Sequence, residues 1–444
     1  MIRILNLNVF IIYLRCLLTK IKISHKLINM YSNKNIAIAG FALEGHALYD
    51  YLTKHNEDIK IHIFDEKYQD VPHNCIFHHN LNIPKSISTV YKAPGIPLDK
   101  LILENKNTQI KTITNILFEN IKGLIIGITG TKGKSTTSSL IYHVLKDFGL
   151  DVVLIGNIGD PGLEYLDSDH KDKVYVYEMS SYMCDSLTSY SPHIAVITNI
   201  YKDHLDYHKT FENYVNAKLK INKFQKKSDY LITTNSTLET FHKLNLDINN
   251  NVLKKIIDVQ NLNIYETKLL GSHNQININL TYEVAKLFSV SQNQFVNSIK
   301  TFDPLPGRLE KIDERKGVIF YEDYLATIPE ATWAGIQALG DVNTIILGGQ
   351  DRGIDFEEFA KQLETSSIQN FILFADTGIK MVKYIKDKNK NIINVSNMEE
   401  AINAVYKYTK GICLLSTASP SLNMFKNYKD RSEQFKYWIN KLSI

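Results

Sequence analysis

The 444-residue sequence has few cysteines, prolines and tryptophans for its length: four, ten and two, respectively. The cysteines, Cys16, Cys75, Cys184 and Cys413, lie far apart and form no CxxC pair. This spacing indicates neither a disulfide framework nor a zinc site, and it favours reduced thiols and a cytoplasmic location. The formal net charge of +4 is small, so composition gives no reason to expect a nucleic-acid partner.

Long apolar runs are also absent. The most apolar N-terminal stretch, 2–18, contains Arg3 and Arg15, is short for a membrane span and lacks a small-residue cleavage site. We therefore predict no membrane span, and we expect residues 1–32 to be an extension outside the fold, with Met30 as an alternative start. A membrane-surface segment and a poorly formed signal sequence are the other interpretations.

One segment is rich in glycine and lysine: GITGTKGKST, residues 127–136. A short apolar run, 123–128, precedes it and a helix-like stretch, 138–148, follows it. A glycine-rich turn between a strand and a helix directs backbone N–H groups toward one point, and the helix adds the positive end of its dipole there. The segment therefore predicts a site for nucleotide phosphates and an ATP-consuming enzyme.

The polar residues of this loop supply the remaining chemistry of a phosphate site. Lys134 adds a mobile cation, and Ser135 or Thr136 adds a hydroxyl that can ligate Mg²⁺. The glycine spacing departs from the strict phosphate-loop pattern, because Ile128 stands where that pattern has glycine. The loop is therefore a variant, and the variation helps to identify its family.

Strand-like and helix-like segments alternate along the chain, which predicts an α/β fold with parallel sheets. We expect a Rossmann-like N-terminal domain over 33–118, a central P-loop ATPase-type domain over 119–302 and a Rossmann-like C-terminal domain over 303–444. The predicted strands are 35–40, 60–64, 89–92, 123–129, 152–155, 174–178, 194–198, 229–233, 317–321, 343–347, 370–374 and 412–415.

The first block carries a weak nucleotide-binding signal. One strand ends at Gly40 and the next at Asp65, although the full three-glycine fingerprint is missing. Asp65 is placed to accept hydrogen bonds from a ribose or a base, or it is a solvated turn residue. Gly95 lies in the turn that follows the strand 89–92.

Polar residues follow several strands of the second block, where ligands of parallel α/β sheets bind. Glu178 at a strand end can bind Mg²⁺, or can be a helix-capping or surface acid. His204, beside Asp203, can ligate a metal as a neutral imidazole, although alone a structural role is the better interpretation. Asn157 also follows a strand, and Lys218 lies on a predicted helix where a surface position is the default.

Taken together, these segments resemble the Mur ligases, ATP-dependent amide-forming ligases of peptidoglycan precursor synthesis. The resemblance covers residues 35–441 and is closest to the glutamate-adding members, with a C-terminal signature over 415–435. The motifs that carry it are GITGTKGKST, Glu178-Met-Ser-Ser, Thr198-Asn199 through Asp203-His204, Gly271-Ser-His-Asn274 with Asn277, Pro306-Gly-Arg308-Leu-Glu310 and Leu347-Gly-Gly349.

The resemblance implies a role for each matching residue. Catalytic residues would be Lys134, Glu178, His204 and Lys218. Ligands for two Mg²⁺ ions would be Ser135, Glu178, His204 and a carbamylated Lys218. ATP would contact Gly130, Thr131, Lys132, Gly133, Lys134, Ser135, Thr136, Asn274, Asn277, Arg308 and Asp323. The UDP-substrate would contact Gly40, Asp65, Gly95, Asn157 and Ser180. Glutamate would contact Thr327, Arg352, Ser421 and Tyr428.

The resemblance also implies a reaction. The carboxylate of UDP-N-acetylmuramoyl-L-alanine would attack the γ-phosphate of ATP, and the amine of glutamate would then displace phosphate from the acyl phosphate. The protein would act as a cytoplasmic monomer with no nucleic-acid partner. The third domain would close over the site and exclude water.

Three departures from the family pattern bear on the amino acid that is added. Leu325 and Arg352 stand where glutamate-adding members have lysines, and Lys132 stands where asparagine is common. These changes resemble a divergent branch that includes ligases adding L-glutamate, so D-glutamate is expected with L-glutamate as the alternative. A folylpolyglutamate synthase-like ligase is disfavoured by the first block, which those enzymes lack. A non-catalytic nucleotide or UDP-sugar binder is disfavoured by the retained catalytic set.

Overall fold

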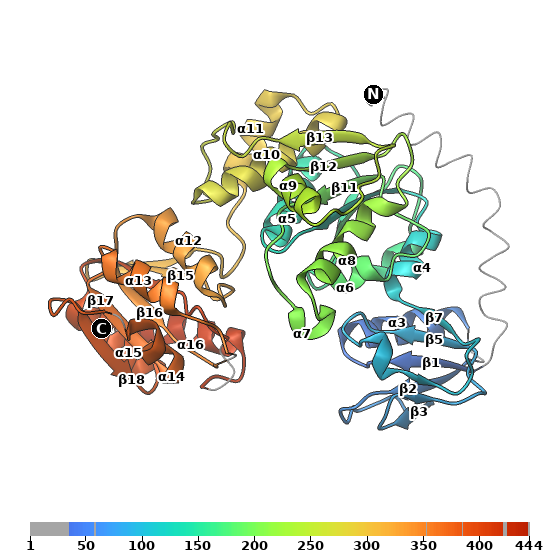
Figure 1. Cartoon of the computed structure of the whole chain (residues 1–444), viewed down its shortest axis with the longest axis horizontal. Coiled ribbons are helices and arrows are strands. Elements are labelled where there is room, and N and C mark those ends of the chain that lie inside the picture. The colour runs from blue at the N-terminus through green and yellow to red at the C-terminus, as the bar shows by residue number, and fades with distance from the viewer. Residues whose placement is uncertain (1–34, 57–58, 352, 384, 421–423, 443–444) are drawn as a thin grey trace. The chain divides into compact units, whose positions relative to one another are not determined.

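The computed structural model describes residues 35–56, 59–351, 353–383, 385–420 and 424–442. These residues form two compact units (Figure 1). The first unit contains the described residues up to Tyr265 together with Gln275–Lys300. The second contains Glu266–Asn274 and the described residues from Thr301 onward.

The first unit begins with a five-stranded parallel sheet in the order β3-β2-β1-β5-β7. Helix α3 (Leu43–His55) connects β1 to β2, as in a nucleotide-binding βαβ unit. A short 3₁₀ helix, η1 (Leu98–Lys100), follows β5, and β4 (Asn82–Ile83) pairs with β6 (Ile102–Leu103). The sheet strands are β1 (Asn35–Ala39), β2 (Lys60–Phe64), β3 (Cys75–His78), β5 (Thr89–Lys92) and β7 (Gln109–Lys111).

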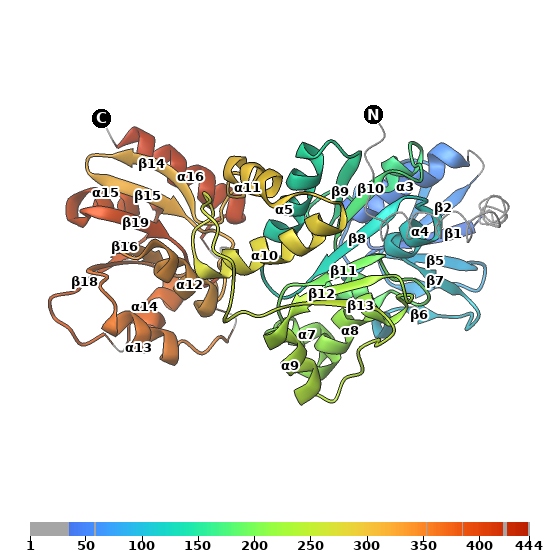
Figure 2. The same cartoon turned by 90° about the horizontal axis from the view of Figure 1, so that it is seen from above.

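A second sheet of the same unit has six parallel strands in the order β13-β12-β11-β8-β10-β9. Its strands are β8 (Leu124–Thr129), β9 (Val152–Gly156), β10 (Val174–Glu178), β11 (Ile194–Ile197), β12 (Tyr230–Thr234) and β13 (Leu253–Ile257). Its helices, several of them visible from above in Figure 2, are α5 (Lys134–Asp147), α6 (Ser181–Asp185), α7 (Leu205–His208), α8 (Phe211–Lys223), α9 (Asn235–Lys243), α10 (Ser272–Leu287) and α11 (Gln292–Thr301). All six residues of β8 are buried, as expected of an inner strand covered on both faces.

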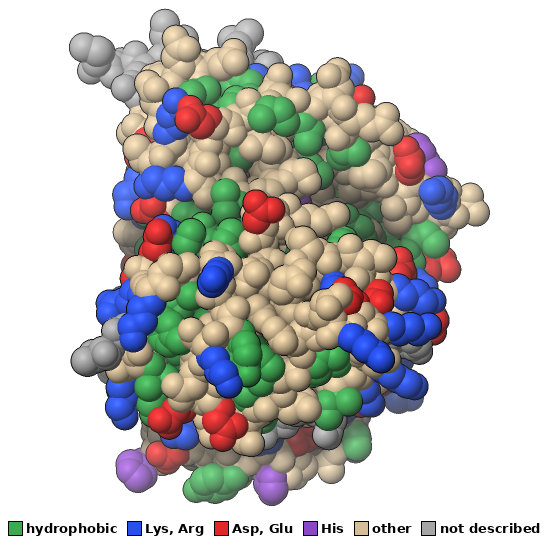
Figure 3. All heavy atoms as spheres, turned by 90° about the vertical axis from the view of Figure 1, so that its left-hand side faces the viewer, with side chains coloured by type: hydrophobic (Ala, Val, Ile, Leu, Met, Phe, Trp, Pro, Cys, Tyr) green, Lys and Arg blue, Asp and Glu red, His purple; other side chains and the backbone are tan. Residues whose placement is uncertain are grey.

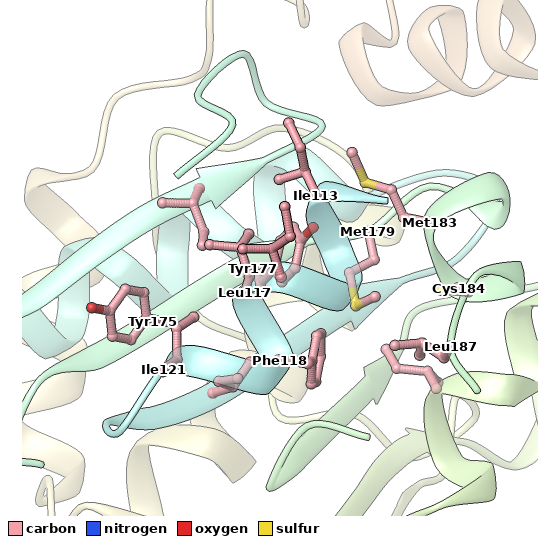
Figure 4. Packing of buried hydrophobic residues seen from close by; sticks show 14 of the residues in the cluster. Ile113, Leu117, Phe118, Ile121, Tyr175, Tyr177, Met179, Met183, Cys184 and Leu187 are labelled. Carbon is pink, nitrogen blue, oxygen red and sulfur yellow. The ribbon is translucent and has the colours of Figure 1, made fainter. Parts of the chain in front are cut away.

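Helix α4 (Ile113–Asn120) packs its apolar face onto β10 of the second sheet (Figure 4). A capping box of Thr112 and Asn115 begins the helix, so its first N–H groups are satisfied. Phe118 contacts the ring of Tyr177 with centroids 6.0 Å apart, and the Tyr177 hydroxyl bonds to Thr114 Oγ1 at 3.0 Å. The core of the first unit is therefore continuous from the first sheet to the second.

The second unit has a six-stranded sheet in the order β14-β15-β19-β16-β17-β18. Its strands are β14 (Glu310–Arg315), β15 (Val318–Glu322), β16 (Val342–Leu347), β17 (Asn370–Phe374), β18 (Asn391–Val395) and β19 (Gly411–Leu415), and its helices are α12 (Pro329–Leu339), α13 (Glu357–Thr365), α14 (Ala375–Val382), α15 (Met398–Tyr408) and α16 (Tyr428–Lys441). The expectation of wholly parallel sheets is wrong at β14, which is antiparallel to β15. Lys316 (φ 51°) and Gly317 (φ 76°) form a two-residue turn, which is long enough only for an antiparallel hairpin.

The predicted α/β fold class is confirmed, and each predicted strand is present with small shifts at its ends. Seven further strands, β3, β4, β6, β7, β13, β14 and β18, were not among the predicted strands, and helix α10 was not among the predicted helices. Strands β13 and β18 lie at sheet edges with mostly exposed side chains, so they lack the apolar runs of inner strands. Helix α10 is rich in asparagine and β-branched residues, which have low helix propensity.

The surface and the cysteines agree with the composition. Side chains of both charge signs are interspersed on the face drawn in Figure 3. Of the helices in the described ranges, none combines the length and the apolarity that crossing a membrane requires. The three described cysteines, Cys75, Cys184 and Cys413, are free thiols, and Cys16 lies outside the described residues.

Candidate active site

The loop after β8 is the structural centre of the candidate site. Gly133 is the N-cap of α5 with φ 81°, and Gly130 has φ 147°. Both conformations favour glycine. A Cβ at Gly130 would lie 1.9 Å from Thr198 Oγ1, and one at Gly133 would lie 2.5 Å from Asn277 Oδ1. The glycines are therefore required by close packing as well as by backbone conformation.

The segment after β11 holds this loop in place. Thr198 Oγ1 and Asn199 Nδ2 both donate to the carbonyl of Lys132, at 2.6 and 3.0 Å. In return, Asn199 Oδ1 accepts the N–H of Lys132 at 2.9 Å, and the Asn199 carbonyl accepts the N–H of Thr131 at 2.9 Å. The Lys132 side chain lies 3.6 Å from Asp203. The backbone of the phosphate loop is therefore fixed before any phosphate binds.

Two lysines meet at this loop. Lys134 Nζ donates to the carbonyls of Gly130 and Thr131 at 3.0 Å each, and Lys218 Nζ, from α8, donates to the Gly130 carbonyl at 2.7 Å. Lys218 is 1% exposed, so the expectation of a surface lysine is wrong. Burial, reinforced by the charge of Lys134, lowers the pKa of Lys218 to about 7. Lys218 is therefore an amine that is partly neutral near pH 7.

Glu178 lies at the carboxyl end of β10 with 1% exposure. Its Oε1 accepts from Asn157 Nδ2 at 2.9 Å, and its Oε2 accepts from Ser138 Oγ at 3.4 Å. Ser138 also donates to the carbonyl of Ser135, so the carboxylate lies beside the first turn of α5. The surface interpretation of Glu178 is excluded, and a buried carboxylate held by neutral donors suits a bound cation.

His204 lies at the N-terminus of α7 with φ 52°, a left-handed conformation that is uncommon for residues other than glycine. Its Nδ1 is 2.9 Å from the Tyr182 hydroxyl. Burial lowers the pKa of His204, with Asp203 opposing and with Lys218 and Lys134 adding to the shift. The imidazole is therefore neutral at pH 7, as a metal ligand must be.

The donor set suits Mg²⁺ only with help from other ligands. In the parts of the chain that the structure describes, no three His, Cys, Asp or Glu side chains come together to hold a metal ion. Glu178 and His204 would therefore need partners of other kinds, such as the Ser135 hydroxyl, phosphate oxygens or a modified Lys218. Hard oxygen ligands of this kind are those that Mg²⁺ prefers.

The residues predicted for the UDP-substrate lie at the ends of the first two sheets. Asp65 accepts the N–H groups of Phe41 and Lys67, each at 2.9 Å, so its carboxylate fixes the turn between β1 and α3. Gly40 occupies that turn with φ 88°. Ser180 is the N-cap of α6 and accepts from Met183 N at 3.2 Å. Both polar side chains therefore have local structural roles, and their contacts with the UDP-substrate stay predictions.

Asn277 and Asn274, which lie close together on α10, fall in different units. Asn277, in the first unit, accepts from Thr137 Oγ1 at 3.2 Å and so contacts the phosphate-loop helix directly. Asn274, in the second unit, donates to the carbonyl of Leu270 at 2.7 Å. The structure thus brings Asn277 to the loop.

In the second unit, the predicted residues lie near the carboxyl ends of the strands. Asp323, after β15, is 8% exposed, and burial raises its pKa to about 6 against the charge of Arg308. Tyr428 stacks on Tyr324 with centroids 5.2 Å apart. The N–H of Thr327 donates to the Leu325 carbonyl at 3.1 Å. Arg352 and Ser421 lie outside the described residues.

Arg431 and Glu322 are buried charged residues near the carboxyl ends of the strands in the second unit. Neither was assigned a role from the sequence. Arg431, on α16, is 1% exposed and donates to Thr417 Oγ1 at 2.8 Å and to the Tyr324 carbonyl at 3.0 Å. Glu322 is fully buried and accepts from Ser432 Oγ at 2.7 Å. Arg431 falls within the C-terminal signature 415–435, which was the available signal for it.

A preformed phosphate loop beside a buried carboxylate, at the carboxyl edge of a parallel sheet, defines the class of P-loop nucleotide-dependent enzymes. Comparison with known proteins narrows this class. A model of the Mur ligase middle domain matches residues 128–293, and a model of the Mur ligase glutamate ligase domain matches residues 307–419. The chain belongs to the Mur ligase family.

Curated relatives include two UDP-N-acetylmuramoylalanine–D-glutamate ligases. The one from Oenococcus oeni is 30% identical over 431 residues, which cover 92% of this chain and 97% of the relative. The one from Thermoanaerobacter sp. is 30% identical over 461 residues, which cover 92% and 98%. Among solved structures, the Thermotoga maritima UDP-N-acetylmuramate-alanine ligase MurC has a TM-score of 0.59 at 16% identity, with 92% of this chain and 99% of that chain covered. This structural likeness supports the fold.

Proposed function

We propose that this protein joins D-glutamate to UDP-N-acetylmuramoyl-L-alanine with conversion of ATP to ADP and inorganic phosphate, a step of peptidoglycan precursor synthesis. The observation that carries the proposal is full-length similarity to ligases of that name, combined with a phosphate loop on which Lys134 and Lys218 converge. We assign the substrate, ATP and glutamate sites to the 33–118, 119–302 and 303–444 regions, and the reaction to a monomer in the cytoplasm.

The phosphate loop accounts for the first step. The substrate carboxylate attacks the γ-phosphorus of ATP, which forms an acyl phosphate and releases ADP. Lys134, at the start of α5, turns from the loop carbonyls to the transferring phosphoryl group and stabilises its charge. Mg²⁺, bound near Ser135 and Glu178, would supply further charge neutralisation of the phosphates.

Lys218 is assigned as a lysine that reacts with CO₂. Its neutral amine, the form that a pKa of about 7 makes available, would add to CO₂ and release a proton, giving a carbamate. The product carries a negative charge beside Lys134 and replaces a repulsive pair of ammonium groups with an attractive one. A carbamate oxygen is also a hard ligand suited to Mg²⁺.

The second unit would bind the incoming amino acid. We assign Thr327, Arg352, Ser421 and Tyr428 to glutamate, whose amine attacks the acyl phosphate carbonyl and expels inorganic phosphate. Arg352 suits the carboxylate because a guanidinium can bind it through two parallel hydrogen bonds. Leu325 cannot bind a carboxylate, and this departure, together with Arg352 and Lys132, keeps L-glutamate as the second candidate.

The test is phosphate release measured with ATP, UDP-N-acetylmuramoyl-L-alanine and either D- or L-glutamate. We expect release only when all three substrates are present, with D-glutamate preferred. A preference for L-glutamate would mean that the enzyme adds L-glutamate by the same reaction. Release without the UDP-substrate, or no release with either glutamate, would contradict the proposal.

A further inference from the structure

Lys92, the last residue of β5, is a buried lysine with 7% exposure. Its Nζ donates to the carbonyls of Ala93 at 2.9 Å, Pro94 at 3.1 Å and Ile96 at 2.6 Å. An ammonium has three donors, so the carbonyls of a single turn use all of them. The lysine therefore acts as an internal clamp on the turn 93–96.

The charge of this clamp is maintained by its surroundings. Burial lowers the pKa of Lys92 to about 8, while the carboxylates of Asp185 and Glu44 oppose the shift. The side chain is therefore mainly protonated at pH 7. A buried ammonium is costly unless it is fully hydrogen-bonded, so the three carbonyls are needed to keep it in place.

The clamp determines which way the turn faces. Pro94 and Pro97 have no N–H, and the N–H of Ile96 already donates to the Ala93 carbonyl at 3.1 Å. The Pro94 carbonyl points toward Lys92, so the N–H on the other side of that planar peptide, which belongs to Gly95, points away from it. A Cβ at Gly95 would meet no atom within 4 Å, so the residue borders open space.

The clamped turn also contacts the glycine turn after β1. A Cβ at Gly40 would lie 2.8 Å from Ala93 Cβ and 2.9 Å from Ile96 Cδ1. A side chain at Gly40, or a shift of the turn 93–96, would therefore disturb both turns. The two glycines assigned to the UDP-substrate lie on touching turns, and Lys92 fixes one of them.

We propose that Lys92 is a positioning residue for the UDP-substrate: it clamps the turn 93–96 so that the Gly95 N–H faces a phosphate oxygen of that substrate. The inference rests on the proposed function and deepens it, because Lys92 acts through Gly95 and does not touch the reacting atoms. Such a residue affects binding of one substrate and leaves the chemical step unchanged.

The test is the substitution Lys92→Met, which keeps the length of the side chain and removes the ammonium. The matched control is Lys390→Met, because Lys390 is also a buried lysine, with 8% exposure, that donates to two backbone carbonyls, those of Leu363 at 3.0 Å and Ser366 at 2.8 Å. Binding of UDP-N-acetylmuramoyl-L-alanine is measured by calorimetry, and kcat and the KM of each substrate by phosphate release.

For Lys92→Met we expect the Kd and KM of the UDP-substrate to rise about tenfold, the loss expected for one misplaced hydrogen bond to a charged group. The KM values of ATP and glutamate, and kcat, should stay within about twofold of wild type. Lys390→Met should leave the Kd of the UDP-substrate unchanged. An unchanged Kd in Lys92→Met, or an equal loss for all three substrates, would overturn the proposal.

Two further variants keep the proposal testable if Lys92→Met does not fold. Gly95→Pro removes the N–H that the clamp presents, and Gly95→Ala keeps it. We expect the Kd of the UDP-substrate to rise about tenfold more in the proline variant than in the alanine variant, and equal values would overturn the proposal. If wild-type protein binds no UDP-substrate, the proposed function fails first and this inference falls with it.

Discussion

The phosphate loop of the first unit and the strand ends of the second differ in how completely their polar groups are hydrogen-bonded. In the loop, Thr131, Lys132 and Lys134 all bond to groups within the same unit. At the strand ends, in nearby loops and on α16 of the second unit, several buried polar atoms have no hydrogen-bond partner within the described ranges. They are Arg308 Nε, Glu322 Oε1, Gln350 Oε1, Ser419 Oγ and Arg431 Nε.

This difference indicates two ways of building a binding site. A fully bonded loop is preorganised, so phosphate binding needs little rearrangement of the backbone. Buried polar atoms without partners cost stability, and water or a substrate recovers that cost. We therefore expect the first unit to bind nucleotide much as it stands, and the second unit to tighten when its amino acid binds.

The largest expected effect is at the preorganised loop. Lys134→Ala should lower kcat about 10³-fold, because it removes the cation that stabilises the transferring phosphoryl group. Binding of the UDP-substrate, measured by calorimetry, should stay unchanged. Wild-type turnover in this variant would show that the loop is not the site of phosphoryl transfer.

The next effect is on the stability of the second unit. Arg431→Met should lower the free energy of unfolding by about 3 kcal/mol, because it removes the buried hydrogen bonds of the guanidinium to Thr417 and Tyr324 and a positive charge that offsets the burial of Glu322. Urea unfolding followed by circular dichroism measures the loss. The Kd of ATP for the first unit is the internal control. We expect Arg431→Met to leave this Kd unchanged. A Kd that rises as the stability falls would contradict the claim that the two regions are independent.

A pH effect distinguishes Lys218 from the other loop residues. With a pKa of about 7, roughly a tenth of Lys218 is neutral at about pH 6 and roughly nine tenths at about pH 8. Only the neutral amine combines with CO₂, so activity should fall as the pH drops below 7, and added bicarbonate should stimulate it several-fold more at the lower pH. Equal stimulation at both values would refute the assignment of Lys218.

The smallest expected effect is at the aromatic pair of the second unit. Tyr428→Ala removes the stacking on Tyr324 and should raise the KM of glutamate a few-fold, consistent with about 1 kcal/mol for an aromatic pair. The KM of ATP should not change. Tyr437→Ala, on the exposed side of the same helix, is the control, and an equal effect there would remove Tyr428 from the glutamate site.

The sequence predicts the inner strands and the phosphate loop because their signals are local. Apolar runs identify the buried strands, and the glycine and lysine spacing identifies the loop. Edge strands such as β13 lack such runs, and the β14–β15 turn depends on Lys316 adopting a positive φ that lysine rarely adopts.

Local sequence signals do not specify contacts between residues that are far apart in the chain. Asn199 bonds to the loop from a position 67 residues further along the chain; its place after a strand predicts that it lies near the loop, but not that it bonds to the backbone of Lys132. Lys92 is the last residue of a predicted strand, and only the fold shows that the carbonyls of the following turn enclose its ammonium group. Local sequence favours a surface position for Lys218, and only the family resemblance indicates a catalytic role. Its burial in the structure gives a physical reason why its amine can react.

The central claim is that the loop at residues 127–136 transfers phosphate to a substrate carboxylate. The most direct measurement uses UDP-N-acetylmuramoyl-L-alanine with its carboxylate labelled with heavy oxygen, followed by mass spectrometry of the inorganic phosphate released. An acyl phosphate carries the label, so one labelled oxygen should appear in each phosphate formed with glutamate present. Unlabelled phosphate would mean that water attacks ATP directly, and it would contradict the account.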